Sequence, residues 1–411
     1  MEPFNPLRPG FLDDPYPFYH RFRSHDPVHC AVAPTPGRPG FWYLFRHADV
    51  AATLKDPRFG RELHRVSPSA VAPVLPETHR AFYEMAGKWM LYRDPPDHTR
   101  LRTLVSKAFT PSVVTALRPR IAEVANSLLD AAEDRGGMDV IADFAFPLPL
   151  IIIAELLGVP AEDQVQFRAW SNALSAAIDQ NRTAQVYEEA SSATVALHDY
   201  FLEILEERRR CPQNDLISRL SEAEEQGGHL SEEEIVATCI LLLGAGQGTT
   251  VDLIGNSVVA LLRHPAQLQY LKENLDAMPA AVEELLRYDS PVQMTARVAL
   301  EDVSIGGKTI RQGAKVTMVL GAANRDPDVF ANPDCLDLQR NPKMHMAFGV
   351  GIHFCLGGIL ARAGGQIALA SLLQRFPDLH LLTDEPDSRE GIVFRGFQSI
   401  PVTWSMADCL S

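Results

Sequence analysis

The sequence has little cysteine and no cysteine framework. Its six cysteines lie at positions 30, 211, 239, 335, 355 and 409, without the short, regular spacing of a disulfide-stapled domain or a zinc site. This distribution is typical of a reducing compartment. A disulfide scaffold is therefore excluded as the basis of the fold, and we expect the protein to be cytoplasmic.

Long hydrophobic runs are also missing. Hydrophobic residues make up 46% of the 411 residues, yet no apolar run reaches the roughly 20 residues that a membrane-spanning helix needs. The N-terminus lacks a charged-then-apolar signal. We expect a large core and no membrane contact. No linker-like stretch divides the chain, so we predict a single domain over residues 1–411.

Positive charge is in deficit. The chain has 38 Lys and Arg residues against 52 Asp and Glu residues, a formal net charge of −14. Proteins that bind nucleic acids usually carry basic surfaces, so this balance argues against a nucleic-acid partner.

The most informative stretch reads Ala347-Phe348-Gly349-Val350-Gly351-Ile352-His353-Phe354-Cys355-Leu356-Gly357-Gly358. Gly349, Gly351 and Gly357 allow positive φ or a close approach of the backbone to another group. An apolar helix is predicted over 356–372, so Cys355 lies where a loop enters a helix N-terminus, a position that stabilises a thiolate. Such a thiolate can attack a substrate, form a disulfide or bind a metal.

Several other interpretations of this loop are open. A phosphate-binding loop needs Lys followed by Ser or Thr at the helix start, and neither is present. A zinc site needs more ligands than His353 adds. A cysteine nucleophile has no base at a recognisable position. A lone cysteine is most often a buried structural residue.

The string Phe-Gly-x-Gly-x-His-x-Cys-x-Gly resembles the haem-binding loop of the cytochrome P450 family. The resemblance implies that Cys355 is the axial thiolate ligand of the iron in haem b, with Gly357 in the same motif. It also implies that Phe348 packs beside the sulfur and that His353 reaches a haem propionate. Thiolate ligation pushes electron density onto the iron, and N–H donors of the loop temper the charge on sulfur.

A basic pair lies on a helix that is predicted to begin after Pro95-Pro96. His98 and Arg102 are four residues apart and share a helix face. Alone they would be a solvated basic face. They are similar to the family's His-x-x-x-Arg pair, which implies contact with a haem propionate, and Arg297 matches the second propionate contact. Two cationic donors suit a buried carboxylate.

A long helix is predicted from the capping box of Ser231 and Glu234 to about residue 263. At about 1.5 Å per residue it is roughly 50 Å long, and its middle is apolar on all sides and therefore buried. That middle nevertheless contains Gly244, Gly246 and Gly248. Each interior glycine costs about 1 kcal/mol relative to alanine, so we expect a flat, bulky group against this helix rather than packing alone.

This helix resembles the family's long distal helix, where the usual pattern is Ala-Gly-x-Asp/Glu-Thr-Thr. The resemblance implies that Ala245 lies against the haem and that Thr249 hydrogen-bonds dioxygen. The acidic position is occupied by Gly248, which carries no proton, and Asp252 lies about one turn beyond Thr249. The catalytic candidates on this helix are Gln247, Gly248, Thr249 and Thr250.

Further residues are assigned by the same resemblance. Glu284 and Arg287, ordinarily a surface ion pair, would form the family's Glu-x-x-Arg pair, completed by Arg325, and would brace the haem loop. The expected substrate pocket is lined by Met85, Trp89, Met90, Leu242, Ala245, Val292, Met294, Thr295, Phe394 and Phe397. The first three are equally well explained as ordinary core residues.

The predicted fold is mainly α with a small β region: the cytochrome P450 fold, with a long central distal helix and a haem-binding cysteine loop. Helices should fill most of 110–226, and the connection between two long helices within 161–209 is expected to roof the pocket. Short strands are predicted at 28–32, 41–45, 303–305, 316–319, 393–395 and 402–404.

The resemblance covers His98 to Phe397 and implies a haem-thiolate monooxygenase of secondary metabolism. Such an enzyme inserts one oxygen atom from O2 into a small organic substrate, by hydroxylation or epoxidation. Electrons would come from NAD(P)H through a separate ferredoxin and its reductase, docked on a basic face near Cys355. The residues expected on this face are Arg100, Lys107, Lys343 and Arg362.

Two alternatives stay open. Gly248 leaves room for a haem-thiolate enzyme that uses peroxide or catalyses a non-hydroxylating oxidation. A haem-binding sensor or carrier without turnover is the other alternative. In each case we expect a monomer.

Overall fold

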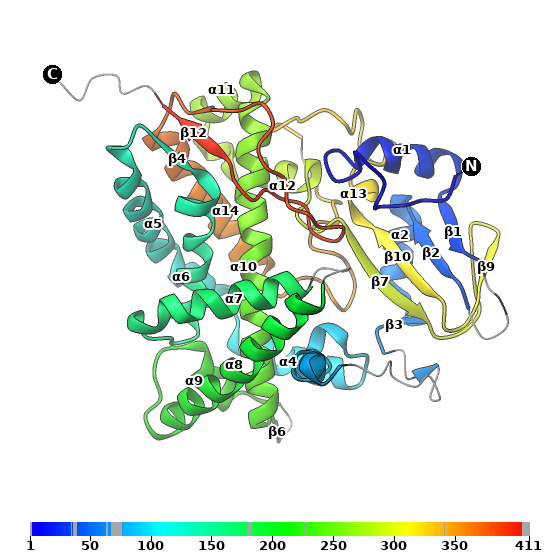
Figure 1. Cartoon of the computed structure of the whole chain (residues 1–411), viewed down its shortest axis with the longest axis horizontal. Coiled ribbons are helices and arrows are strands. Elements are labelled where there is room, and N and C mark those ends of the chain that lie inside the picture. Colours follow the sequence, from blue (N-terminus) through cyan, green and yellow to red (C-terminus); the bar gives the residue numbers. More distant parts are fainter. Residues whose placement is uncertain are drawn as a thin grey trace. The chain divides into compact units, whose positions relative to one another are not determined.

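Helices dominate the structure (Figure 1). The computed structural model describes residues 2–33, 35, 39–62, 65–66, 76–178, 183–225, 227–340 and 342–404. Within these residues the strands form four small sheets. The predicted class, mainly α with a small β region, is confirmed.

The chain divides into two compact units. The first comprises residues 1–67, 121–147 and 249–411, and the second comprises 68–120 and 148–248. Three helices contain a boundary between them: α5 (Pro111–Glu133), α6 (Pro147–Leu156) and α10 (Glu232–Leu262).

Helix α1 contributes Tyr19 and Phe22 to a buried cluster of aromatic side chains in the first unit. This helix follows Asp14-Pro15, where the Asp14 carboxylate accepts a hydrogen bond from the amide of Tyr16 at 3.1 Å and proline sets a helical φ. The helices wholly within this unit are α1 (Tyr16–His25), α2 (His47–Lys55), the π-helical turn η4 (Val140–Ala145), α11 (Pro265–Glu273), η6 (Leu275–Ala277), α12 (Met278–Tyr288), α13 (Leu320–Ala323) and α14 (Gly358–Arg375).

A five-stranded sheet forms the β part of the first unit. Its order is β1 (Val28–Val32), β2 (Phe41–Leu44), β10 (Lys315–Val319), β7 (Met294–Ala299) and β3 (Phe59–Gly60). Strand β10 runs parallel to β2 and antiparallel to β7, so Val316 lies opposite both Trp42 and Arg297. The alternating buried side chains of these strands make one hydrophobic core with α2.

Two smaller sheets complete the first unit. Strand β12 (Pro401–Thr403) pairs with β4 (Gly137–Asp139) and β11 (His380–Leu381), and β8 (Val303–Ile305) pairs with β9 (Lys308–Ile310). The strand predicted at 393–395 is only an isolated bridge between Val292 and Phe394.

The second unit is a helical layer. Its elements are η2 (Glu77–His79), α3 (Arg80–Ala86), η3 (Met90–Tyr92), α4 (Asp97–Ala108), η5 (Ala161–Asp163), α7 (Gln164–Ile178), α8 (Ala184–Arg210), α9 (Leu216–Glu222), β5 (Glu224–Glu225) and β6 (Gly228–His229). Helices α7 and α8 pack through Phe167 and Phe201, whose rings meet nearly perpendicularly at 6.1 Å. Their connection, the predicted pocket roof, includes residues 179–182, which lie outside the described residues.

Helix α10 starts as predicted. The amide of Glu234 donates to Oγ of Ser231 at 3.2 Å, and the amide of Ser231 donates to Oε2 of Glu234 at 2.9 Å. One expectation is corrected: α10 is long and apolar enough to cross a membrane, although 67% of its most apolar window is buried inside the protein. Its hydropathy is therefore that of a core helix.

The glycines of α10 are also explained differently from the prediction. A β-carbon at Gly246 would lie 3.0 Å from Cδ1 of Ile153 on α6, and one at Gly244 would lie 3.1 Å from Cδ1 of Ile178 on α7. Both contacts are inside the second unit. These two glycines allow close helix packing, so they do not require a bound group.

Candidate functional site

The backbone of the Cys355 loop depends on two glycines in the left-handed region. Gly349 has φ +67° and Gly351 has φ +79°, which L-residues with a β-carbon rarely adopt. A β-carbon at Gly351 would also lie 2.5 Å from the carbonyl oxygen of Leu54. The loop is therefore folded tightly against the end of α2.

Phe348 contacts Cys355 through its backbone and the first turns of α14 through its ring. Its carbonyl oxygen accepts a hydrogen bond from the amide of Cys355 at 3.0 Å. Its ring packs on the backbone of Gly358 and lies 4.3 Å below the guanidinium of Arg362. Cys355 is half-buried, and α14 begins at Gly358, three residues after it. The helix start was predicted two residues earlier.

The space beside the loop fits a bound prosthetic group. A β-carbon at Gly349 or at Gly357 would meet no heavy atom of the described chain within 4 Å. Gly357 has φ −78°, so neither its backbone conformation nor crowding by the protein requires glycine there. A loop that leaves room next to a thiol is what a planar cofactor ligated by Cys355 requires.

Two guanidinium groups converge in the first unit. Nη1 of Arg297 and Nη2 of Arg61 both donate to Oγ1 of Thr295, at 3.4 and 3.2 Å. Arg297 is only 4% exposed and also donates to the carbonyl of Ala296 at 2.8 Å. The sequence analysis missed Arg61, because only the pairing of Gly60 with Val298 brings it to this position.

The Glu284–Arg287 pair is buried, as the Glu-x-x-Arg assignment requires. Both side chains have no exposed area, and the guanidinium donates to the carboxylate at 2.7 and 2.8 Å. Arg287 also donates to the carbonyl oxygens of Asn324, Pro333 and Cys335. The pair therefore fixes the chain that leads into the Cys355 loop.

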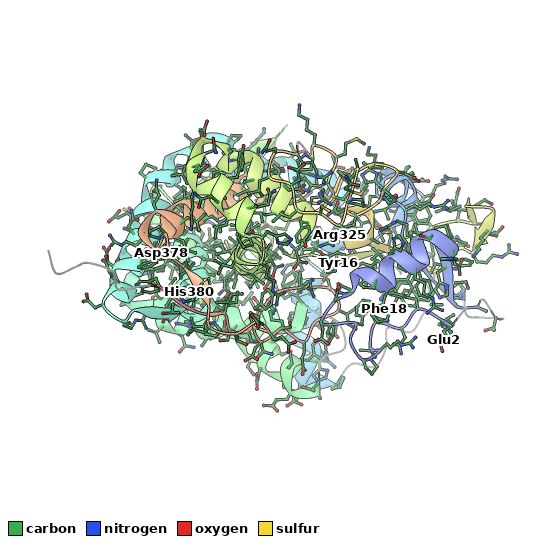
Figure 2. All side chains as sticks on the ribbon, turned by 90° about the horizontal axis from the view of Figure 1, so that it is seen from above. Glu2, Tyr16, Phe18, Arg325, Asp378 and His380 are labelled. Atoms are coloured by element: carbon green, nitrogen blue, oxygen red, sulfur yellow. The ribbon has the colours of Figure 1, made fainter. Side chains whose placement is uncertain are left out.

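The third member of this cluster is Arg340, not Arg325. Nε of Arg340 donates to Oε1 of Glu284 at 3.1 Å. Arg325 instead lies between Tyr16, 3.5 Å from its ring centroid, and Tyr288, at 4.1 Å. Figure 2 shows Arg325 beside Tyr16. The prediction of Arg325 was wrong because both arginines follow α12 in sequence and only the fold decides which reaches Glu284.

A second carboxylate, Glu283, connects α12 to the cysteine loop. It accepts from Nε of Arg362 at 2.5 Å and bonds Nε2 of His345 at 2.8 Å. Burial alone would raise the pKa of Glu283, but the hydrogen bonds from His345 and Arg362 outweigh it and lower that pKa to about 2. Arg362 is thereby held over the ring of Phe348.

The part of α10 in the first unit carries Thr249, Thr250 and Asp252. Thr249 is half-buried, whereas Thr250 is buried and its methyl group is the atom nearest to Gly364 of α14, 3.8 Å from a β-carbon placed there. Asp252 has no exposed area and forms an ion pair with Arg389 at 3.0 Å. Of the two threonines, Thr249 is therefore the more exposed.

The predicted pocket residues of the first unit lie on two adjoining segments. Val292 pairs with Phe394 through a backbone bridge, and Met294 and Phe397 are buried. The hydroxyl of Thr295 is used by the two arginines described above.

Apart from His353, which is half-buried in the cysteine loop of the first unit, the remaining predicted residues belong to the second unit. His98 is buried and Arg102 half-buried, one turn apart on α4. Oε1 of Gln247 accepts a hydrogen bond from the hydroxyl of Ser171 at 2.5 Å. Three of the apolar residues, Met85, Trp89 and Met90, are buried, and three positions on α10 are half-buried: Leu242, Ala245 and Gly248.

Known proteins resemble this chain over nearly its whole length. The sequence model of the family named Cytochrome P450 matches residues 41–396. The chain is 45% identical over 398 residues to the biotin biosynthesis cytochrome P450 of Bacillus subtilis (strain 168), covering 96% of this chain and 97% of that protein. It is 40% identical over 406 residues to the polyketide biosynthesis cytochrome P450 PksS of the same organism, with 98% of each covered.

Solved structures share the fold. The crystal structure of P450BioI in complex with acyl carrier protein ligated with hexadec-9Z-enoic acid matches with a TM-score of 0.88 and 44% identity, over 96% of this chain and 99% of that one. The resemblance inferred from the Cys355 loop is confirmed. The chain therefore belongs to the cytochrome P450 family, whose members are haem b-binding monooxygenases.

Proposed function

We propose that this enzyme inserts one oxygen atom from O2 into a fatty-acyl substrate, with Cys355 as the thiolate ligand of haem iron. The Cys355 loop carries the ligand assignment, through its two left-handed glycines, the amide of Cys355 bonded to Phe348, and the open space at Gly357. Haem ligated by a thiolate supplies the oxygen activation, since the thiolate donates electron density to iron.

Basic side chains would hold the haem propionates. In the first unit the guanidinium groups of buried Arg297 and half-buried Arg61 share Thr295, and guanidinium groups make strong charge-assisted hydrogen bonds to a carboxylate. The resemblance adds a histidine of the cysteine loop and the basic pair of α4. The proposed propionate ligands of the first unit are Arg61, Arg297 and His353, and the assignment of His98 and Arg102 in the second unit stays a prediction.

Proton delivery would use the hydroxyl of Thr249. Gly248 provides no acid beside it, and Gln247 is bonded to Ser171. Asp252 does not replace the missing acid, because Arg389 holds both of its carboxylate oxygens. We propose that water, together with an acidic or hydroxyl group of the substrate, passes protons to Oγ1 of Thr249 in place of the acid that Gly248 lacks.

The substrate class is taken from a relative that this chain resembles over nearly its whole length. That structure holds a C16 acyl chain on a carrier protein. We propose a fatty-acyl substrate here as well, free or carrier-bound, in contact with apolar residues of the first unit. They are Val292, Met294, Phe394 and Phe397.

Two measurements test the reaction and the substrate. Cys355→His should still bind haem but lose the red-shifted Soret band of the reduced carbonyl complex. An unchanged band would contradict the assignment of Cys355 as the iron ligand. Hexadec-9Z-enoic acid, free and linked to acyl carrier protein, should shift the haem spin state of the native enzyme and be oxidised with NADPH, ferredoxin and reductase. Turnover with peroxide alone would favour the peroxide-using alternative, and binding without turnover would favour a sensor or carrier.

Thr249→Ala tests the proton relay separately. It should divert a larger share of the NADPH consumed to hydrogen peroxide, and Gly248→Asp should change the same share. Coupling that Thr249→Ala leaves untouched would remove Thr249 from the relay and favour a non-hydroxylating reaction.

For the electron-donor surface we propose apolar contacts in place of the basic face that the sequence predicts. Arg362 is bound to Glu283, and Arg100 of the second unit is bound to Glu234. Four of the exposed large hydrophobic side chains instead cluster in sequence around Cys355: Met344, Ile352, Phe354 and Ile359, exposed by 61, 51, 40 and 45%. Contiguous exposed apolar patches mark interaction sites, and we infer that these four side chains form such a patch.

We therefore propose that a ferredoxin-type donor docks mainly through apolar contacts with these four residues, with Lys343 exposed at their edge. Phe354→Ser should slow reduction by a [2Fe–2S] ferredoxin about tenfold and leave fatty-acid binding unchanged. Val195→Ser, at an exposed apolar residue of the second unit, is the control. A wild-type rate that falls tenfold or more between low and high salt would instead favour charge-driven docking.

We further propose that the enzyme is a cytoplasmic monomer and that its 411 residues act as one catalytic domain.

A further inference from the structure

One segment of the proposed pocket is held to α10 by polar side chains. Residues 387–398 carry Phe394 and Phe397. Nη1 of Arg389 lies 3.0 Å from each carboxylate oxygen of Asp252. One turn further along α10, Nδ2 of Asn256 donates to the carbonyl oxygen of Arg395 at 3.0 Å.

The fit between α10 and this segment is close. A β-carbon at Gly396 would lie 2.6 Å from Cγ of Asp252, so the backbone of the segment touches the carboxylate. Asp252 has no exposed area, whereas the side chain of Arg389 is 24% exposed. The arginine thus reaches inward from the surface to neutralise a carboxylate on the central helix.

The segment also has backbone hydrogen bonds besides this ion pair. The amide of Arg389 donates to the carbonyl of Gly396 at 3.0 Å, and the amide of Gln398 donates to the carbonyl of Asp387 at 2.7 Å. On its other side, the amide of Arg395 donates to the carbonyl of Pro291 at 2.8 Å. Loss of the ion pair would free the segment to move without detaching it.

A buried ion pair is a poor device for stability. Removing a carboxylate from water costs free energy that its partner only partly returns, and apolar side chains of similar volume are often as stable. What the pair adds is a fixed orientation of Arg389 relative to α10, because both carboxylate oxygens of Asp252 accept from one guanidinium nitrogen. Asp252 lies one turn from Thr249, so Arg389 is held next to the proposed proton relay.

We propose that the Asp252–Arg389 ion pair is a specificity-determining clamp. By fixing residues 387–398 on α10, it sets how far Phe394 and Phe397 stand from the turn that carries Thr249. It thereby selects the chain length that binds and the carbon that is oxidised. Both are positioning residues that act through the two phenylalanines. The inference rests on the proposed function, since it assigns a role in substrate choice.

The test uses the haem-loaded enzyme and saturated fatty acids of 10 to 18 carbons. Asp252→Asn, Arg389→Gln, the double variant and Arg389→Lys are compared with wild type. Glu155→Gln, which removes the half-exposed ion pair with Arg120 in the second unit, is the control. Dissociation constants come from spin-state titrations and the oxidised position from product analysis.

Each of Asp252→Asn and Arg389→Gln should change the ratio of dissociation constants between C12 and C16 at least fivefold and shift the oxidised carbon. The double variant should match either single one, because one interaction is removed in all three. Arg389→Lys should restore most of the wild-type ratio, and the control should keep it. Ratios within twofold of wild type in both single variants, or effects that multiply in the double variant, overturn the clamp.

Hydrogen exchange gives a readout that needs no substrate. The amides of Arg389 and Gln398 should exchange at least tenfold faster in Arg389→Gln than in wild type, and unchanged exchange overturns the clamp. If no fatty acid shifts the wild-type spectrum, the proposed substrate fails on its own. The length ratio is then measured with 1-alkylimidazoles of graded length, which ligate haem without being substrates. Should Asp252→Asn not bind haem, the two Arg389 variants decide.

Discussion

Replacing Glu284 by glutamine removes the charge that compensates Arg287, and the structure allows the cost to be worked out. Both side chains are fully buried, and removing one partner of a buried ion pair costs about 3–5 kcal/mol. Unfolding entropy is about 2.1 cal/mol/K per residue, or about 0.86 kcal/mol/K for 411 residues. Glu284→Gln should therefore lower the Tm of the haem-loaded enzyme by about 3.5–6 °C.

Arginine variants then show which side chain completes the cluster. Arg340→Gln should be coupled to Glu284→Gln, by about 0.5–3 kcal/mol, because it removes a hydrogen bond to the same carboxylate. Arg325→Gln should be additive with Glu284→Gln to within about 0.5 kcal/mol, since Arg325 is held by Tyr16 and Tyr288. Far-UV circular dichroism at pH 7 gives each Tm. Coupling of Glu284 to Arg325 and none to Arg340 would refute the assignment.

Three further outcomes are expected. Gly351→Ala should lose most haem incorporation, judged by the ratio of Soret to protein absorbance, whereas Gly349→Ala should lose less, because only Gly351 also meets the carbonyl of Leu54; equal losses would mean that φ alone matters. The folded state lowers the pKa of Glu283 from 4.5 to about 2, so the stability that its charge contributes is complete above the unfolded pKa and is lost as pH falls toward the folded pKa. The difference in urea midpoint between wild type and Glu283→Gln should therefore shrink from pH 5 to pH 3. A constant difference contradicts this. Gly246→Ala should change stability by less than about 1 kcal/mol, since the gain in helix propensity offsets a small shift of Ile153, whereas Gly246→Val should be clearly destabilising in the same urea assay.

Local signals in the sequence predicted local structure well. The strand at 28–32 and the capping box at Ser231 each depend on neighbouring residues, and both were found. Of the three loop glycines expected to allow positive φ or a close approach, Gly349 and Gly351 have positive φ and Gly357 does not. The cysteine loop belongs with them, because its geometry is encoded within a dozen residues. The family follows from that one loop.

Contacts between distant segments were not predictable. Arg340 and Arg325 offer the same chemistry, and the choice between them is made by Tyr16, some 300 residues away. Arg61 meets Arg297 only through the pairing of β3 with β7. Gly246 looked like a sign of a cofactor until α6 was placed beside it. In each case the partner that decides the contact is distant in the sequence, so the residues around the one concerned do not indicate it.

The cluster around Tyr16 has a practical consequence for handling this protein. The hydroxyl of Tyr16 donates to Asp289 at 2.7 Å, and Arg395, next to Phe394, bonds Asp289 and the carbonyls of Leu12 and Asp13. Trimming the first 16 residues to aid crystallisation would therefore remove two acceptors of Arg395, the carbonyls of Leu12 and Asp13, and the hydroxyl that donates to Asp289. An N-terminal affinity tag should be joined ahead of Phe4, whose ring is already buried among Phe11, Phe22 and Tyr43, and enzymes prepared with different leaders should be compared on product profile as well as yield.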